Sequence, residues 1–143
     1  MNKLILGIDA GNYEGKTAGS YGVDAWYTNI SASKERKVIE KFGEDDMEFE
    51  VNGRKGLAGS IAKYESRFGS KGMYGASKAH WYTEVRVLLS IYRYAVKYGV
   101  SANNVSIVVG QPYVGHTDAL KAELKSMLQK SHAVTVNGEN MTI

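Results

Sequence analysis

Hydrophobic and polar residues follow one another in patterns that predict short strands near the N-terminus. Residues 4–8 (LILGI) form a continuous apolar run, which is typical of a strand buried on both faces. Residues 26–30 (WYTNI) are rich in residue types that favour strands. We interpret residues 22–25 (GVDA) as a turn before them. This part of the chain therefore predicts three consecutive strands, and the polar residues 31–46 predict an exposed connection.

A hairpin is predicted next. Met47, Phe49 and Val51 alternate with acidic residues, as in a strand with one buried face. Asn52-Gly53 follows, and this dipeptide is a strong short-range signal for a hairpin turn. Residues 54–59 (RKGLAG) would then form the returning strand.

Helical periodicity begins after a glycine-rich and serine-rich stretch. Within residues 79–99, apolar side chains recur at helical spacing, with Ser77 placed to cap the helix and Gly99 placed to end it. Glu84 and Arg86 are expected on its solvated face. A buried-type strand at 105–109 (VSIVV), a second helix opening at Thr117-Asp118 and a C-terminal hairpin through Asn137-Gly138 complete the pattern.

Composition limits the classes of protein that the chain can belong to. The 143 residues are enough for one domain with a hydrophobic core, and no apolar run is long enough for a membrane span. The absence of cysteine excludes disulfides and fits a reducing compartment, so we expect a cytoplasmic protein with no membrane partner. A net charge of +3 allows an anionic ligand, but it is too small to favour direct nucleic-acid binding.

The chemically most informative stretch is Ala10–Thr17 (AGNYEGKT). Its spacing matches a loose phosphate-loop pattern that ends in Gly-Lys-Thr. A true P-loop requires a helix directly after this motif, because the helix N-terminus holds the phosphates. The following residues (KTAGSYGVDAWYTNI) contain glycines and strand formers instead, which argues against a P-loop.

A β-hairpin that binds phosphate is the alternative. Asp9 ends the buried strand, and Gly11-Asn12 would form a turn whose backbone N–H groups face an anion. Lys16 would lie on the returning strand with its ammonium toward the same anion. Asp9 would hold Mg²⁺ through water, since magnesium keeps several of its own waters. Thr17 is expected to pair within the strand rather than to contact the metal.

This stretch resembles the first phosphate motif of the actin-like ATPases, the superfamily of actin, sugar kinases and DnaK-type chaperones. That motif is an apolar strand followed by Asp, a spacer, Gly, a polar residue, two spacers, a small residue and Lys. Here those positions hold Asp9, Gly11, Asn12, Gly15 and Lys16. The resemblance implies an α/β, ribonuclease-H-like fold (actin-like ATPase domain I), with a mixed sheet and flanking helices.

Two later stretches resemble the plasmid-segregating, ParM-type branch of this superfamily. Residues 108–116 (VVGQPYVGH) are similar to its strand–Gly–Leu–Pro passage, with Gln111 in place of Leu, and residues 136–143 (VNGENMTI) are similar to the hairpin before its interdomain helix. The resemblance implies binding of ATP or GTP with Mg²⁺, self-association into filaments, and a DNA-bound adaptor protein as a partner.

The family's second phosphate loop, its adenine-binding glycines and the residue that orients the attacking water all come later in the chain. We therefore expect residues 1–143 to form a single actin-like N-terminal domain without the second half of the ATPase. ATPase activity is expected only of a full-length two-domain chain, and residues 1–143 alone are expected to be inactive, with the catalytic residues unknown. A metal site built from His80, His116 and His132 is not expected, because they lie far apart in the sequence.

Two other functions remain open on the sequence. The chain could be a domain of another member of the superfamily, such as a small-molecule kinase or a chaperone ATPase. It could also be a protein-interaction module with no nucleotide role. The first alternative predicts phosphoryl transfer without filaments, and the second predicts that replacement of Lys16 has no effect.

Overall fold

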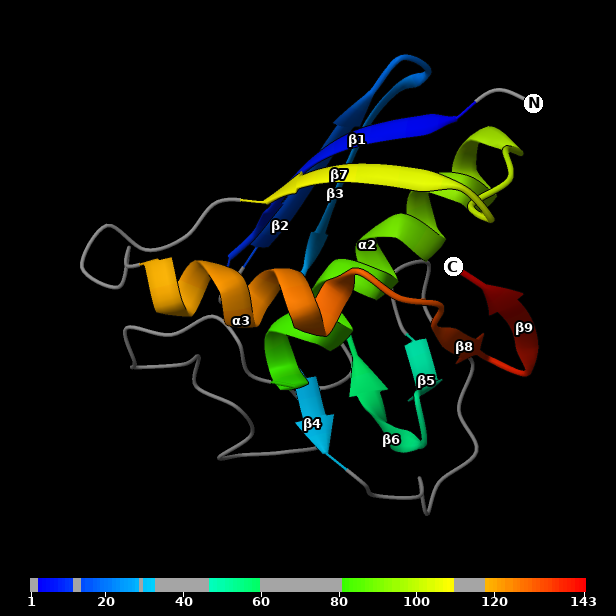
Figure 1. The fold of residues 1–143 in the computed structure, drawn as a ribbon. Coiled ribbons are helices and arrows are strands. Elements are labelled where there is room, and N and C mark those ends of the chain that lie inside the picture. Colours follow the sequence, from blue (N-terminus) through cyan, green and yellow to red (C-terminus); the bar gives the residue numbers. More distant parts are fainter. Residues whose placement is uncertain (1–2, 12–13, 29, 33–46, 60–80, 110–117) are drawn as a thin grey trace.

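The computed structural model describes residues 3–11, 14–28, 30–32, 47–59, 81–109 and 118–143 (Figure 1). The first sheet has the strand order β3-β2-β1-β7. These strands are β1 (Leu4–Ala10), β2 (Glu14–Gly19), β3 (Gly22–Tyr27) and β7 (Val105–Val109). β1, β2 and β3 form an antiparallel meander, and β7 runs parallel to β1. The predicted mixed sheet is thus confirmed.

A second, fully antiparallel sheet has the order β4-β6-β5-β8-β9. Its strands are β4 (Ile30–Ala32), β6 (Arg54–Ala58), β5 (Met47–Val51), β8 (Ala133–Val136) and β9 (Glu139–Thr142). The two hairpins that the sequence predicted separately meet here, because Phe49 of β5 pairs with Val136 of β8. Sequence patterns had predicted one sheet, and this long-range pairing makes a second.

Helix α2 (Trp81–Tyr98) lies between the two sheets, and α3 (Asp118–Leu128) lies beside β7 and α2 (Figure 1). Val85, Leu88 and Leu89, which the helical spacing predicted as core residues of α2, are at 0–1% exposure. The same spacing included Val96, which is 58% exposed, so that part of the prediction is wrong. Glu84 and Arg86 are also buried, at 8% and 1%, so their predicted place on a solvated face is wrong. Because sheets cover α2 on two sides, little of its surface remains for water. No helix in the described part of the chain is long and apolar enough to cross a membrane.

The two faces of β1 are not equivalent. Leu4, Leu6 and Ile8 point toward α2 and are at most 5% exposed, whereas Ile5 on the other face is 63% exposed. The expectation of a strand buried on both faces is therefore wrong for the described residues. Their burial alternates with a period of two, as it does when only one face of a strand is covered.

The turns are set by a few residues with unusual backbone angles. Asn52-Gly53 and Asn137-Gly138 all have positive φ, and each pair closes a hairpin as predicted. The β2–β3 turn lies at residues 20–21, before the predicted 22–25, since Gly19 pairs with Gly22. The Tyr94 hydroxyl on α2 accepts hydrogen bonds from the N–H groups of Tyr21 and Gly22 at 2.9 and 3.1 Å.

Candidate phosphate-binding hairpin

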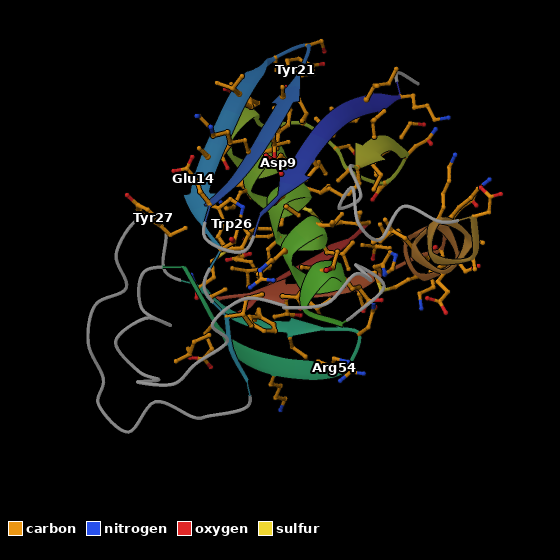
Figure 2. All side chains as sticks on the ribbon, turned by 90° about the vertical axis from the view of Figure 1, so that its left-hand side faces the viewer. Asp9, Glu14, Tyr21, Trp26, Tyr27 and Arg54 are labelled. Atoms are coloured by element: carbon orange, nitrogen blue, oxygen red, sulfur yellow. The ribbon has the colours of Figure 1, made fainter. Side chains whose placement is uncertain are left out.

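The β1–β2 hairpin brings an acid and a base onto the same open face of the first sheet. Asp9 lies directly opposite Lys16 in the antiparallel ladder, and both side chains are exposed on the face that α2 does not cover. In Figure 2, Tyr21 marks one end of the first sheet. Asp9, Glu14 and Tyr27 lie farther along the sheet, away from that end. Directly opposed residues have Cβ atoms only about 4.5–5.5 Å apart, so an anion bound by Lys16 would lie near the turn, and a cation that accompanies it could be held by Asp9.

Lys16 has a nearer carboxylate than that of Asp9. Its Nζ lies 3.6 Å from Glu14 Oε1, and both side chains are largely exposed, at 68% and 48%. Glu14 and Lys16 are two residues apart on β2 and therefore point to the same face. Glu14 is not one of the predicted site residues, although this period of two indicates that it shares the face of Lys16. Glu14 would compete with a bound anion for the ammonium.

Gly11 begins the turn, and no other residue fits its place. A Cβ on Gly11 would lie 2.6 Å from the backbone oxygen of Glu14, which is closer than real contacts allow. The Gly11 carbonyl accepts a hydrogen bond of 2.5 Å from Thr28 Oγ1. Thr28 in turn offers its carbonyl to Arg86 Nε of α2, at 3.0 Å. The turn is thus held to the helix through one buried threonine, Thr28, whose role no sequence pattern indicates.

Gly15 lies on the opposite face from Asp9 and Lys16. It is buried, and an added Cβ would lie 2.7 Å from Thr28 Cγ2 and 3.1 Å from Trp26 Nε1. The Trp26 indole is itself fixed, since its Nε1 donates to Ser90 Oγ at 2.9 Å. The observed reason for a glycine here is close packing behind the hairpin. Any contact from Gly15 to an anion would have to come from its backbone.

Thr17 points into the protein and is only 2% exposed, so it does not share the face of Asp9 and Lys16. Asn12 lies outside the described residues. Gly15, Lys16 and Thr17 all belong to β2. The loop followed by a helix that a P-loop needs is therefore not present at this motif.

Helix α2 also holds the third strand of the sheet. Arg93 Nε donates to Asp24 Oδ2 on β3 at 2.9 Å, and the guanidinium lies 5.8 Å from the ring centre of Trp26. Asp24 is 6% exposed at its side chain, so this ion pair is sheltered from water. These contacts fix the hairpin's neighbouring strand, and we assign them a structural role.

The described residues contain no group of three or more His, Asp or Glu side chains that could hold a metal ion directly. His132 is buried, with Nδ1 2.8 Å from Asn52 Nδ2 and Nε2 2.9 Å from the Leu128 carbonyl. His80 and His116 lie outside the described residues. A metal at the hairpin would accordingly depend largely on water and on the ligand that it accompanies.

The family model for the N-terminal domain of actin-like proteins matches residues 7–143. No curated protein sequence matches the chain. The match to the family model begins within β1 and covers the rest of the first sheet, the second sheet and the two helices that the structure describes.

Solved structures show the same fold. The apo ParM protein of psk41 superposes with a TM-score of 0.76 and 20% identity, over 100% of this chain and 47% of that chain. A filament of AlfA from a B. subtilis plasmid, pLS32, superposes with a TM-score of 0.74 and 19% identity, over 98% of this chain and 53% of that chain. Bacillus thuringiensis ParM with AMPPNP superposes with a TM-score of 0.69 and 17% identity, over 100% of this chain and 43% of that chain. The chain thus spans about half the length of these proteins, and the predicted actin-like fold is confirmed.

Proposed function

The chain belongs to the family of actin-like protein N-terminal domains, and on this premise we propose that it supplies the first phosphate-binding hairpin of a filament-forming ATPase of the plasmid-segregation type. The observation that carries the proposal is the pairing of Asp9 with Lys16 on the open face of the first sheet. The pair lies beside Gly11, at whose position a side chain would collide with the Glu14 backbone oxygen.

The hairpin has the donor set that a nucleotide phosphate with Mg²⁺ requires. Lys16 would bind phosphate oxygens through its ammonium, and Gly11 with Asn12 would offer turn N–H groups. Gly15 contributes backbone only. Asp9 would hold Mg²⁺ through water, and a magnesium ion bound there would offset the negative charge of the phosphates. Gly11 lets the chain turn closely against the Glu14 backbone, because a Cβ at this position would lie 2.6 Å from the Glu14 carbonyl oxygen.

These residues would bind and orient the nucleotide phosphates and Mg²⁺. We assign none of them the role of activating the attacking water. A charge-assisted contact contributes roughly 1.5–3 kcal/mol. After the entropy of association, two or three such contacts leave binding of about millimolar strength. Residues 1–143 alone should therefore bind a nucleotide weakly and hydrolyse it poorly or not at all.

Similarity to the AlfA filament and to ParM with AMPPNP supports self-association and adenine-nucleotide binding in the two-domain protein. GTP remains an alternative nucleotide, and an adaptor protein on DNA is the partner that we propose for such a filament. The cysteine-free sequence supports a cytoplasmic location. The same likenesses favour this function over a small-molecule kinase, a chaperone ATPase or an interaction module.

An NMR titration of the chain with Mg-ATP tests the proposal, because it detects millimolar binding. Saturable shifts should appear at the amides of residues 9–17. A parallel titration with sodium chloride at matched ionic strength gives the shifts that arise from salt alone. Shifts no larger than those of sodium chloride, or shifts centred elsewhere, would refute the proposed phosphate role.

A further inference from the structure

A buried side chain reaches across the phosphate-binding hairpin from the third strand of the sheet. Thr28 directly follows β3, where the chain passes from the first sheet toward β4 of the second, and it is 0% exposed. Gly11 directly follows β1. Because β2 lies between β1 and β3 in the sheet, the hydrogen bond from Thr28 to Gly11 spans the beginning of β2.

Gly15 on β2 makes this reach possible. Gly15 lies on the buried side of its strand, and a Cβ added to it would lie 2.7 Å from Thr28 Cγ2. The Thr28 methyl therefore occupies, beneath β2, the space that a side chain in place of Gly15 would need. The glycine of the sequence motif and the buried threonine are thus complementary in size.

The hydroxyl of Thr28 sets the direction of one peptide group in the turn. Thr28 Oγ1 donates to the Gly11 carbonyl at 2.5 Å, which draws this oxygen toward the buried side of the hairpin. In a planar trans peptide the N–H group points opposite to the carbonyl oxygen. The N–H group that follows Gly11 would therefore point toward the open face, where Asp9 and Lys16 lie.

Without this bond the peptide group would be freer to turn. Glycine accepts backbone conformations that other residues avoid, so Gly11 by itself restricts the peptide little. A carbonyl oxygen on the open face would present its partial negative charge to a bound phosphate and would repel it. Thr28 is itself fixed, because its carbonyl accepts a hydrogen bond from Arg86 Nε of α2 at 3.0 Å.

We propose that Thr28 is a positioning residue of the phosphate site: its hydroxyl holds the Gly11 carbonyl inward, so that the following N–H group is presented to an anion. This inference rests on the proposed phosphate role of the β1–β2 hairpin. Thr28 itself touches no ligand. It raises the fraction of chains whose turn is ready to bind, and the apparent affinity changes in proportion to that fraction.

Two variants separate the hydroxyl of Thr28 from its methyl. Thr28→Val keeps a methyl beside Gly15 but removes the donor, so Mg-ATP binding in the NMR titration should weaken about two- to tenfold, by the net contribution of one hydrogen bond. Thr28→Ser keeps the donor and loses the methyl. It should bind Mg-ATP more tightly than Thr28→Val, whatever the order of their stabilities in urea.

Tyr94→Phe is the control for lost stability. It removes a hydroxyl that is bonded to the β2–β3 turn, at the far end of the sheet, and should bind Mg-ATP like the unchanged chain. A merely structural role of Thr28 would make affinity follow stability through all three variants. The chemical shift of the Gly11 carbonyl carbon adds a readout without nucleotide: it should move in Thr28→Val and change little in Thr28→Ser.

A size exchange tests the same contact by a second route, which does not depend on the folding of Thr28→Val. The methyl of Gly15→Ala would collide with the Thr28 methyl and should displace the hydroxyl from the Gly11 carbonyl. Gly15→Ala combined with Thr28→Ser removes that collision. The double variant should therefore bind Mg-ATP more tightly than Gly15→Ala alone.

The outcomes distinguish this inference from the function on which it rests. No binding of Mg-ATP by the unchanged chain would overturn the proposed function and this inference with it. If the unchanged chain binds, equal affinity of Thr28→Val, or a Thr28→Ser variant as weak as Thr28→Val, would overturn the inference alone. An unmoved Gly11 carbonyl shift in Thr28→Val, or a double variant no tighter than Gly15→Ala, would do the same and leave the role of Lys16 intact.

Discussion

Asp9 and Lys16 face each other across the β1–β2 ladder, yet the Lys16 ammonium lies 3.6 Å from Glu14 on its own strand. The exposed face of the hairpin thus holds one lysine between two carboxylates. A bound phosphate would replace Glu14 as the partner of the Lys16 ammonium, and Asp9 would hold Mg²⁺ through water. Glu14 acts in this account as a competitor that weakens the site.

Glu14→Gln should strengthen Mg-ATP binding. Exposed ion pairs contribute about 0.2–1 kcal/mol, so release of Lys16 should raise the affinity by a factor of about 1.4 to 5. NMR titration of both chains gives the two dissociation constants. Glu50→Gln is the matched control, because Glu50 pairs with Lys55 at 3.5 Å on the second sheet. Weaker binding by Glu14→Gln would show that Glu14 contributes to the site.

Gly11→Ala should destabilise the hairpin, whereas Gly7→Ala should not. The added methyl on Gly11 would lie 2.6 Å from the Glu14 backbone oxygen, while a methyl on Gly7 meets nothing within 4 Å. We expect a loss of about 1–3 kcal/mol for Gly11→Ala. Gly7→Ala should be neutral or should stabilise by about 0.4–1 kcal/mol. Urea denaturation measures both, and equal stability of the two variants would contradict the tight turn.

Tyr94→Phe should destabilise the fold without weakening nucleotide binding. Its hydroxyl accepts hydrogen bonds from two backbone N–H groups of the β2–β3 turn, at the end of the sheet far from the hairpin turn. An unsatisfied buried donor costs about 1–3 kcal/mol. Tyr98→Phe is a milder comparison, because its hydroxyl donates to the Val23 carbonyl in a more exposed place. A loss no larger than that of Tyr98→Phe would contradict the role of Tyr94.

Stability should fall in alkaline solution through Tyr92. Burial of this side chain, and to a lesser extent the Glu139 carboxylate, raise its pKa. The folded chain therefore holds the phenol proton more firmly than the unfolded chain does. This contribution is present below the ordinary tyrosine pKa of about 10 and is lost as the pH rises above it.

Glu139→Gln removes the smaller of the two causes. The pKa of Tyr92, followed by NMR of labelled tyrosine, should fall only part of the way toward its ordinary value. A complete return to that value would show that the carboxylate, and not burial, dominates.

Local patterns predicted both Asn-Gly turns and the order of the described elements except β4, because these depend on neighbouring residues. Residues 31–32 of β4 were predicted to be part of an exposed connection, and that prediction is wrong. The second sheet was missed, since Phe49 and Val136 are brought together by tertiary pairing. The burial of Arg86 was missed for the same reason: a helix covered by sheets on two sides has little solvated face.

The hairpin was only partly predictable. The sequence placed Lys16 correctly on the returning strand, but it did not indicate the tie from Thr28 to the Gly11 carbonyl. It also assigned Gly15 a ligand position, whereas the structure shows that close packing against Trp26 and Thr28 excludes a side chain there. Such contacts join separate strands, and the hydrophobic periodicity of the sequence does not predict them.

The most direct test of the central claim compares Lys16→Ala with Lys55→Ala in the Mg-ATP titration. Both lysines are exposed on strands and paired with a glutamate, at 3.6 and 3.5 Å. The account predicts that Lys16→Ala weakens binding about tenfold or more, by loss of one charge-assisted contact, and that Lys55→Ala binds like the unchanged chain. Equal affinities of the two variants would contradict the assignment of the β1–β2 hairpin as a phosphate site.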